Sequence, residues 1–293
     1  MTQNNADRAR AGVASTAHLT AWARAIGRLT AGGDAANGDY LAEKCLQPMQ
    51  RLLTRMPRLS RWIFERFLPG ALGYFNARTQ HFDLILAKEA AGLGQVVLLG
   101  AGFDSRPIRF ASELRGVRVF EVDMPEVLAV RAECLLDAPP GSATRIAVPI
   151  DFERDDLWQS LASKGYDANV RTLFLWEGVT YYLQPPAVGA VLSMVANRSG
   201  RGSSILFDYI TEAFVKGDHS SYGAEPLARS WRRLGNINRS GFDDIASFLR
   251  AHGLELRSDL DAETLDQRYL AKLPGRPLKC WGAMHIVLAT VKD

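Results

Sequence analysis

The sequence predicts an α/β protein in which a doubly wound, mostly parallel sheet follows a helical N-terminal region. The apolar period changes near residue 92, and short apolar runs then alternate with helical stretches up to residue 210. Such alternation is typical of a parallel sheet with helices on both faces. In addition, a Gly-x-Gly turn at Gly100 and Gly102 directly follows the first apolar run. Glycines at that point let a ligand approach the backbone closely.

Composition narrows the class of protein. The 293 residues are 47% apolar and 23% charged, which is the balance of a globular chain, and the net charge is only +3. No apolar run approaches the ~18 residues of a spanning helix, and the N-terminus lacks a signal-peptide pattern. The three cysteines and five histidines are scattered, which argues against disulfides or a metal site. We expect a soluble cytoplasmic monomer or homodimer without a nucleic-acid or membrane partner.

Residues 1–91 are expected to form the helical region, packed on a core of residues 92–293. The Ala-rich run 14–29 predicts its first helix, and residues 75–91 repeat apolar side chains at helical spacing. The first 80 residues carry a net charge of +6, so this is a basic segment on a slightly acidic body.

Single residues mark the expected helix limits in the rest of this region. Asp39 is a candidate cap for a helix that runs to about Leu46. Pro57 and Pro69 separate two further helices, with Pro69 in a first turn.

Strands and helices alternate in the core. The expected strands are 95–99, 117–122, 143–150, 172–176, 204–209, 254–256 and 283–291. The expected helices are 105–114, 124–136, 154–163, 186–198 and 242–252. A substrate-side insertion is expected near residues 211–240, where a polar, Gly-bearing stretch interrupts the alternation.

Polar side chains follow several of the expected strands. Asp123 ends the second strand, 21 residues beyond Gly102, where a carboxylate can accept hydrogen bonds from both hydroxyls of a ribose. Capping the next helix is an alternative role for Asp123. Asp151 ends the third strand, where it could accept a hydrogen bond from the amino group of a base or could cap a turn. Glu177 follows the fourth strand and could pair with a ligand amine or with a protein cation.

Arg78 lies on the long helix before the first strand, and its guanidinium suits a carboxylate. A surface position is the alternative. Together, these side chains describe a ligand with a carboxylate, an amine, a ribose and a base. S-adenosylmethionine has all four, whereas NAD has no amino-acid end for Arg78 and Glu177. Ser105 also replaces the third glycine of a dinucleotide fingerprint.

Three segments resemble the leucine carboxyl methyltransferase family: Val-Val-Leu-Leu-Gly-Ala-Gly-Phe-Asp-Ser-Arg at 96–106, Glu-Val-Asp-Met-Pro-Glu at 121–126, and Trp-Glu-Gly-Val-Thr-Tyr-Tyr-Leu at 176–183. The resemblance implies a class I methyltransferase fold, a Rossmann-like seven-stranded sheet, with a helical N-terminal lid. It also implies that S-adenosylmethionine is the cofactor. The resemblance implies Arg78 for the methionine carboxylate, with Gly100 and Gly102 lining that end, Asp123 at the ribose, Asp151 near the adenine and Glu177 near the amine. Four further residues are expected to bind the cofactor: Ala101, Met124, Phe152 and Gly178.

One departure concerns the lid. Many members read Asp-Pro-Tyr near the start, whereas this chain has Asp39-Tyr40, so the lid can be placed differently and Lys44 receives no role.

The resemblance and the motifs predict methyl transfer to a small-molecule carboxylate. A carboxylate is ionised at pH 7 and needs no general base, and no obvious base stands in the cofactor motifs. A hydroxyl or phenol acceptor is the alternative, and it would need a base. The candidate bases are Tyr181, Tyr182, His219, Tyr222 and His285. Two other classes, an NAD-type oxidoreductase and a non-catalytic nucleotide-binding module, remain as rivals.

Two arginine clusters could contact the acceptor. Arg51, Arg55 and Arg58 recur at helical spacing beside Trp62 and Phe64, which predicts either a basic, aromatic-lined mouth or a surface stripe. The second cluster could neutralise an acidic acceptor or line a solvated helix face; it comprises Arg229, Arg232 and Arg233.

Overall fold

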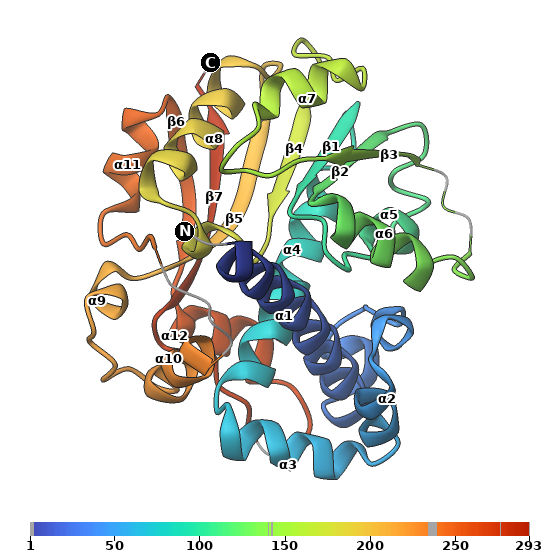
Figure 1. The fold of residues 1–293 in the computed structure, drawn as a ribbon, viewed down its shortest axis with the longest axis vertical. Coiled ribbons are helices and arrows are strands. Elements are labelled where there is room, and N and C mark those ends of the chain that lie inside the picture. The colour runs from blue at the N-terminus through green and yellow to red at the C-terminus, as the bar shows by residue number, and fades with distance from the viewer. Residues whose placement is uncertain (1–2, 140, 142, 234–238, 276, 293) are drawn as a thin grey trace.

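A computed structural model describes residues 3–139, 141, 143–233, 239–275 and 277–292. The described residues form one seven-stranded sheet in the order β3-β2-β1-β4-β5-β7-β6, with only β7 antiparallel to its neighbours (Figure 1). The strands are β1 (Gln95–Leu99), β2 (Arg118–Asp123), β3 (Thr144–Pro149), β4 (Thr172–Trp176), β5 (Ser204–Ile210), β6 (Leu254–Leu260) and β7 (Met284–Val291).

The helices fall into two sets. The N-terminal set is α1 (Gln3–Thr30), α2 (Pro48–Thr54), α3 (Pro57–Phe67) and α4 (Ala71–Glu89), with 3-10 turns at Gly33–Ala35 and Ala42–Cys45. The second set follows or separates the strands: α5 (Arg106–Arg109), α6 (Pro125–Cys134), α7 (Leu157–Ser163), α8 (Pro185–Asn197), α9 (Glu212–Val215), α10 (Ala224–Arg233), α11 (Ile245–Ala251) and α12 (Ala262–Leu265), with a 3-10 turn at Thr180–Tyr182 and a π-helical turn at Asp266–Leu270. None of the described helices is long and apolar enough to cross a membrane.

Apolar side chains cover both faces of the sheet because successive strand residues point to opposite sides. On β1, Val96 and Leu98 join a cluster that also contains Ile26 of α1 and Leu86 of α4. The alternate residues of β1 join a second cluster with α8 and α11 on the other face. The N-terminal helices therefore pack on one face of the sheet, and α1 and α4 reach its carboxyl edge (Figure 1).

The α/β class and the seven-stranded, mostly parallel sheet are confirmed, and each expected strand is present. The strand expected at 254–256 is longer and extends to Leu260. The helix expected at 105–114 is shorter, since α5 ends at Arg109. The short helices α9 and α12 were not predicted from the sequence patterns.

Two local predictions in the N-terminal region are wrong. Asp39 caps no helix, because its buried carboxylate pairs with Arg24 at 2.8 Å and accepts from the Ser105 hydroxyl at 2.6 Å; only a 3-10 turn follows. Pro69 lies outside the first turn of α4, because Gly70 is the N-cap with a φ of 97°. The division at residues 91 and 92 remains a prediction, as does the insertion at 211–240, of which residues 234–238 lie outside the described part.

Candidate active site

The Gly-x-Gly turn follows β1 at the carboxyl edge of the sheet. Gly100 and Gly102 have φ values of 74° and 42°, in the left-handed region that favours glycine. A Cβ atom on Gly100 would lie 2.4 Å from Cγ2 of Val179, so a side chain cannot fit there. Ala101 between them is buried. The backbone of this turn is thereby held close to the segment that follows β4.

Asp123 faces this turn from the end of β2. Its carboxylate accepts hydrogen bonds from the backbone N–H of Gly102 at 2.7 Å and of Met124 at 2.8 Å. Burial raises the pKa of Asp123, and the two N–H donors offset part of that rise. Each carboxylate oxygen can accept a further hydrogen bond, so Asp123 is preorganised to receive two hydroxyl donors.

A cavity of about 260 Å³ opens beyond the tips of β2 and β3, and Met124 and Asp151 are among the residues that line it. Its volume is just below the roughly 300–1,000 Å³ of whole small-molecule sites, so it suits one part of a ligand, such as a base. The Asp151 carboxylate accepts from the backbone N–H of Glu153 at 3.0 Å. Phe152 does not line this cavity; it packs against the apolar cluster on the α8 face.

Arg78 and Glu177 meet at the tip of β4. Nε of Arg78 lies 3.0 Å from Oε1 of Glu177, and Nη1 donates to Oδ2 of Asp208 at 2.6 Å. Asp208 is fully buried on β5 and also accepts from the Tyr74 hydroxyl at 2.8 Å and the Gly178 N–H at 2.6 Å. Asp208 therefore fixes both the guanidinium and the turn that carries Glu177.

One donor in this group has no hydrogen-bond acceptor. The N–H at Nε of Arg78 is buried and is not in hydrogen-bond geometry, although it lies near Glu177. A buried donor without an acceptor is costly, and a ligand carboxylate would supply one. The residues present therefore fit the amino-acid end of the ligand predicted from the sequence.

Charge balance holds Glu177 ionised. Burial opposes its ionisation, but Arg78 and Arg106 lower its pKa to about 2. Nη1 of Arg106 lies 2.8 Å from Glu177 Oε2. Glu177 is thus an anion at neutral pH, able to accept from a ligand ammonium.

These pairs belong to a larger ionic network that joins the N-terminal helices to the sheet. Each member lies within 3.7 Å of another member, and four arginines face five carboxylates. The members are Arg24, Arg78, Arg106, Arg109, Asp39, Asp83, Asp104, Glu177 and Asp208.

Two of the candidate bases, Tyr181 and Tyr182, follow β4. The Tyr181 ring stacks on Trp231 of α10 at 5.1 Å and contacts the Tyr182 ring at 4.7 Å. Burial, with Asp208 next, raises the pKa of Tyr181 well above its usual value, and burial raises that of Tyr182. Both phenols are protonated at neutral pH.

His219 and Tyr222 lie in the segment before α10. His219 joins the aromatic cluster through Phe214, which contacts it at 4.9 Å and contacts Trp231 at 5.9 Å. Nδ1 of His219 lies 3.0 Å from Glu225. Tyr222 is exposed, with Lys279 over its ring.

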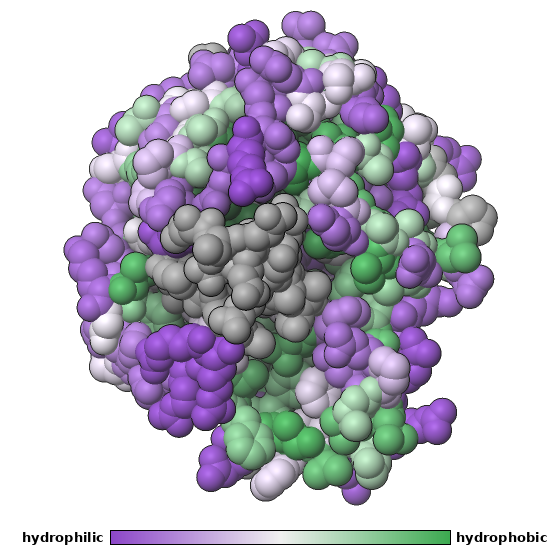
Figure 2. All heavy atoms as spheres, viewed as in Figure 1, coloured by the Kyte–Doolittle hydropathy of each residue, from purple (hydrophilic) through white to green (hydrophobic). Residues whose placement is uncertain are grey.

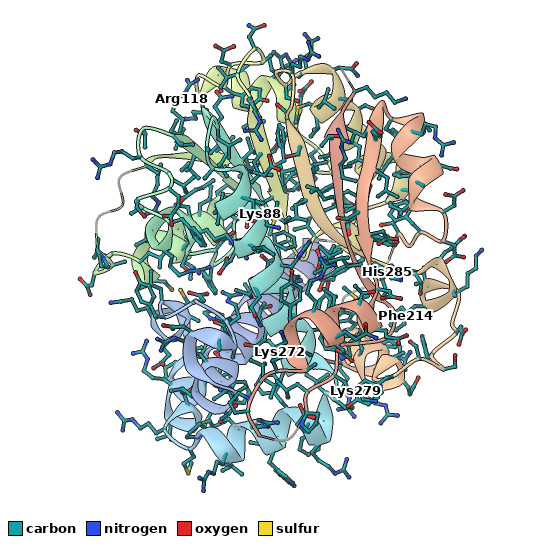
Figure 3. The ribbon with its side chains drawn as sticks, turned by 180° about the vertical axis from the view of Figure 1, so that it is seen from behind. Lys88, Arg118, Phe214, Lys272, Lys279 and His285 are labelled. Atoms are coloured by element: carbon teal, nitrogen blue, oxygen red, sulfur yellow. The ribbon has the colours of Figure 1, made fainter. Side chains whose placement is uncertain are left out.

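His285 lies on the wrong face of the sheet for this site. It stacks on Tyr209 at 5.0 Å and lies 3.2 Å from Asp259, whereas Arg78 pairs with Asp208. Neighbouring strand residues point to opposite faces, so His285 and Arg78 are separated by the sheet. Figure 3 labels His285 on β7, seen from behind.

The sequence patterns singled out neither Asp208 nor the network partners of Arg106. A signal for Asp208 was present: it is an acid inside the apolar run Ser204–Ile210, two residues from the carboxyl end of a strand. Arg106 belongs to the first family-like segment but carried no predicted role. Its partner Asp104 is only two residues away, but Asp83 comes close to it only after α4 packs on the sheet.

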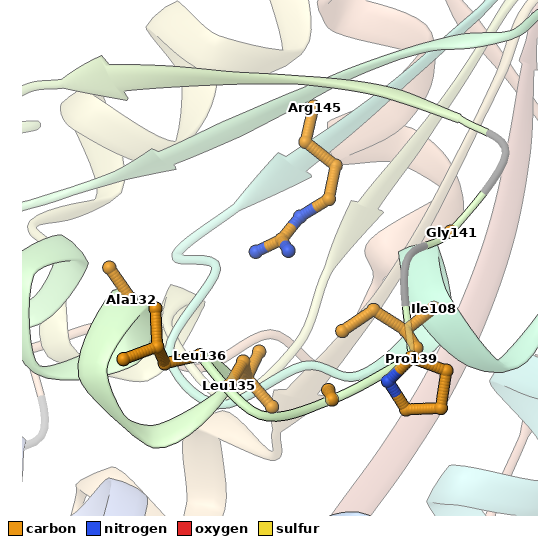
Figure 4. A pocket seen from close by; sticks show the side chains of 8 residues that line it. Ile108, Ala132, Leu135, Leu136, Pro139, Gly141 and Arg145 are labelled. Atoms are coloured by element: carbon orange, nitrogen blue, oxygen red, sulfur yellow. The ribbon is translucent and has the colours of Figure 1, made fainter.

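A second cavity, of about 470 Å³, lies near the start of β3 and away from the strand tips (Figure 4). Its lining is apolar except for Arg145, which extends from β3 toward α6 and bonds Glu121 at 2.6 Å. The guanidinium is therefore already paired.

The strand order and the polar strand tips define the class I methyltransferase arrangement. The fold resembles that of a DUF574-family protein from Streptomyces avermitilis, with a TM-score of 0.58 and 17% identity over 92% of this chain and 97% of that chain. A model of the leucine carboxyl methyltransferase family matches residues 17–196, so the chain belongs to that family.

Relatives carry matching names. A provisionally named S-adenosyl-L-methionine-dependent methyltransferase of Streptomyces coelicolor is 34% identical over 84% of this chain and 83% of its own length. A protein of the same name from Frankia alni is 34% identical over 86% of this chain and 89% of its own length. A protein of the same name from Mycobacterium marinum is 37% identical over 62% of this chain. The match covers 61% of that relative's own length. This chain is thus similar, over 62% to 86% of its length, to proteins that carry this name.

Proposed function

We propose that the protein transfers the methyl group of S-adenosylmethionine to a carboxylate of a small molecule. Family membership and the relatives' names support the methyl donor. They favour it over the NAD-dependent oxidoreductase considered from the sequence.

The predicted site residues would hold the donor along the carboxyl edge of the sheet. Asp123 would accept from the ribose hydroxyls, and the cavity at Met124 and Asp151 would take the base. Arg78 would offer to the carboxylate its Nε–H, which is near Glu177 but not in hydrogen-bond geometry with it, and Glu177 would accept from the ammonium. When bound, S-adenosylmethionine supplies a methyl group already activated by its sulfonium. The chain's task is therefore orientation and exclusion of water.

The protonated state of the neighbouring phenols carries the proposal for the acceptor. A phenol or alcohol acceptor must lose a proton. Tyr181, beside Arg78 and Gly178, is neutral at pH 7 even with its ordinary pKa near 10, and burial raises that pKa further. Asp208 is occupied by three donors. A carboxylic acid has a pKa near 4, so this acceptor arrives already ionised and needs neither residue as a base.

A radiolabelled methyl-transfer assay tests the proposal. Carboxylic acids would be compared with the alcohols and phenols of the same skeleton. A methyl ester releases volatile labelled methanol in mild alkali, whereas a methyl ether does not. We expect alkali-labile product and a rate that stays flat from pH 6 to 9. An alkali-stable product would contradict the carboxylate acceptor while leaving the donor assignment intact; no transfer with any acceptor would count against both.

A hydroxyl acceptor is favoured by one observation. His219 lies 3.0 Å from Glu225, and a histidine oriented by a carboxylate is a common general base. Under this alternative, His219→Gln would abolish an alkali-stable transfer. Under the carboxylate proposal it would leave the maximal rate within about twofold.

A further inference from the structure

Helices α2 and α3 expose an unusual share of the molecule's large apolar side chains. Six of them are between 41% and 66% exposed: Met49, Leu52, Met56, Leu59, Trp62 and Phe67. They account for half of the large apolar side chains that are exposed in the described residues. Figure 2 shows apolar surface gathered at this end of the molecule. We call these six side chains, with the arginines between them, the α2–α3 surface.

This surface is separate from the core. The inward face of α3 carries Ser60 and Phe64, both buried, and the Phe64 ring contacts Trp22 of α1 at 4.7 Å. Leu59 and Trp62 lie three residues apart on the outward face, and Trp62 contacts Phe67 at 6.4 Å. Of the two alternatives left open by the sequence, a mouth lined by both Trp62 and Phe64 is therefore excluded. Only Trp62 faces outward.

The same surface is strongly basic. Residues 48–67 contain five arginines and one acid, Glu65, for a net charge of +4. Four of the arginines are exposed: Arg51, Arg55, Arg58 and Arg66. The Arg66 guanidinium lies 5.6 Å over the Phe67 ring, so charge and apolar surface are interleaved.

We propose that the α2–α3 surface binds peripherally to lipid bilayers that carry anionic headgroups. Helices that lie in a membrane interface present Trp, Phe and Leu to the acyl boundary and arginines to the headgroups. Anionic lipid attracts such a segment by ~1 kcal/mol for each arginine near the surface. The apolar and basic groups of this surface provide both contributions. This inference concerns a different part of the chain from the proposed transfer site and does not depend on it.

Charge and shape disfavour the other occupants. A second copy docked through the same surface would oppose two segments of net charge +4. An acidic protein would match the charge but would need pockets for six separate side-chain tips, because hot-spot aromatics bind in well-packed pockets. A fluid acyl layer accommodates protruding tips without preformed pockets. The proposal revises the expectation of no membrane partner, and it involves no spanning helix among the described ones.

Vesicle sedimentation with the full-length protein tests this binding. Vesicles of phosphatidylcholine would be compared with vesicles of phosphatidylcholine and phosphatidylglycerol at 7:3. We expect binding to the second composition, weakened by 0.5 M NaCl. Trp62 gives a local signal because the other five tryptophans are buried or half-buried. Its emission should shift to the blue on binding, and Trp62→Phe should bind with little shift.

Pairs of substitutions separate the apolar from the electrostatic contribution to vesicle binding. Trp62→Ser with Phe67→Ser should reduce binding at least tenfold, and Arg55→Gln with Arg58→Gln should reduce it about fivefold per arginine. Matched controls elsewhere are Leu136→Ser, which removes the most exposed leucine, and Arg115→Gln with Arg250→Gln. The controls should bind like the parent. Circular dichroism checks that each variant is folded.

Several results would overturn the proposal. The first is that the parent protein binds neither kind of vesicle. The second is that the parent and both α2–α3 variants bind equally well. The third is that the protein binds vesicles while the Trp62 emission stays unchanged. Polyglutamate that binds as tightly as vesicles would assign the surface to an acidic protein instead. A dimer of the parent protein that dissociates in Trp62→Ser would assign it to a second copy.

Discussion

At the scale of single residues, Asp208 is the group on which the candidate site depends most. Its carboxylate is fully buried and takes three hydrogen bonds, including 2.6 Å bonds from Arg78 and Gly178. Charge-assisted bonds of this kind are about twice as strong as neutral ones. Asp208 touches none of the proposed ligand groups, so it is a positioning residue for Arg78.

Asp208→Asn should therefore weaken binding of S-adenosylhomocysteine about tenfold, because the amide no longer balances the Arg78 charge. Adenosine, which lacks the amino-acid end, should bind the variant as it binds the parent. Isothermal calorimetry with both ligands measures the difference. Asp259→Asn is a matched control, since Asp259 bonds the Tyr209 hydroxyl on the opposite face of the sheet. Equal losses for both ligands would mean that Asp208 has only a structural role.

His81 should govern the first step of acid destabilisation. Burial, with Arg268 and Lys88 adding to it, lowers the pKa of His81 from 6.5 to about 4. The unfolded chain then binds a proton at a higher pH than the folded chain. The stability that this provides is complete above about pH 6.5 and is lost as pH falls through 4. The shift corresponds to roughly 3 kcal/mol.

Urea unfolding measured from pH 7.5 to 4 checks the slope of the free energy of unfolding against pH. His81→Gln should reduce this slope relative to the parent chain. An unchanged slope in His81→Gln would exclude the histidine as its source.

At the scale of elements, the turn between β4 and Thr180–Tyr182 requires a glycine. Gly178 has a φ of 77°, and a Cβ there would lie 3.3 Å from Nη1 of Arg78 and 3.5 Å from the Tyr181 hydroxyl. Gly178→Ala should cost about 1–2 kcal/mol from backbone strain and should also displace Arg78. We therefore expect lower stability together with weaker S-adenosylhomocysteine binding.

Gly217→Ala isolates the strain. Gly217 has a φ of 102°, but a Cβ there would meet open space. Thermal unfolding and calorimetry should show a stability loss for both variants and a binding loss only for Gly178→Ala. A binding loss of equal size in both would reject the contact between residue 178 and Arg78.

The strands were the most predictable elements. Runs such as Gln95–Leu99 and Thr172–Trp176 are buried on both faces and bounded by glycine or polar residues, so sequence alone marks their limits. The helical region was less predictable because tertiary pairing decides its ends. Asp39 has the composition of a cap but is drawn into a buried pair with Arg24, a partner 15 residues away.

Part of the candidate site could likewise be predicted from the positions of the strands. Asp123 and Glu177 could be predicted because they end strands, and the carboxyl ends of parallel strands meet at one edge. No role was predicted for Arg106 or Asp208, because all but one of their partners, Asp104, come from distant parts of the chain. Asp208 contacts Tyr74 across 134 residues, a pairing that no local period encodes.

At the scale of the whole molecule, the ionic network connects the N-terminal helices to the sheet. Arg106 is its central member: it lies 2.7 Å from Asp83 of α4, 2.7 Å from Asp104 and 2.8 Å from Glu177. Its side chain is 3% exposed. Removing one partner from such a group leaves buried charges uncompensated, which costs roughly 3–5 kcal/mol. Both the closure of the helical region and the charge of the site therefore depend on this arginine.

Arg106→Gln should loosen the N-terminal helices more than the sheet. Hydrogen exchange on the full-length chain should show faster exchange in α1 and α4, with β4 and β5 protected as in the parent. Arg118→Gln is the matched control, because Arg118 bonds Gln95 within the sheet at 2.7 Å and touches no network member. If exchange rises uniformly in Arg106→Gln, the two parts unfold as one unit and the boundary at residues 91 and 92 is not an energetic one. If α1 and α4 stay protected, apolar packing alone holds them on the sheet.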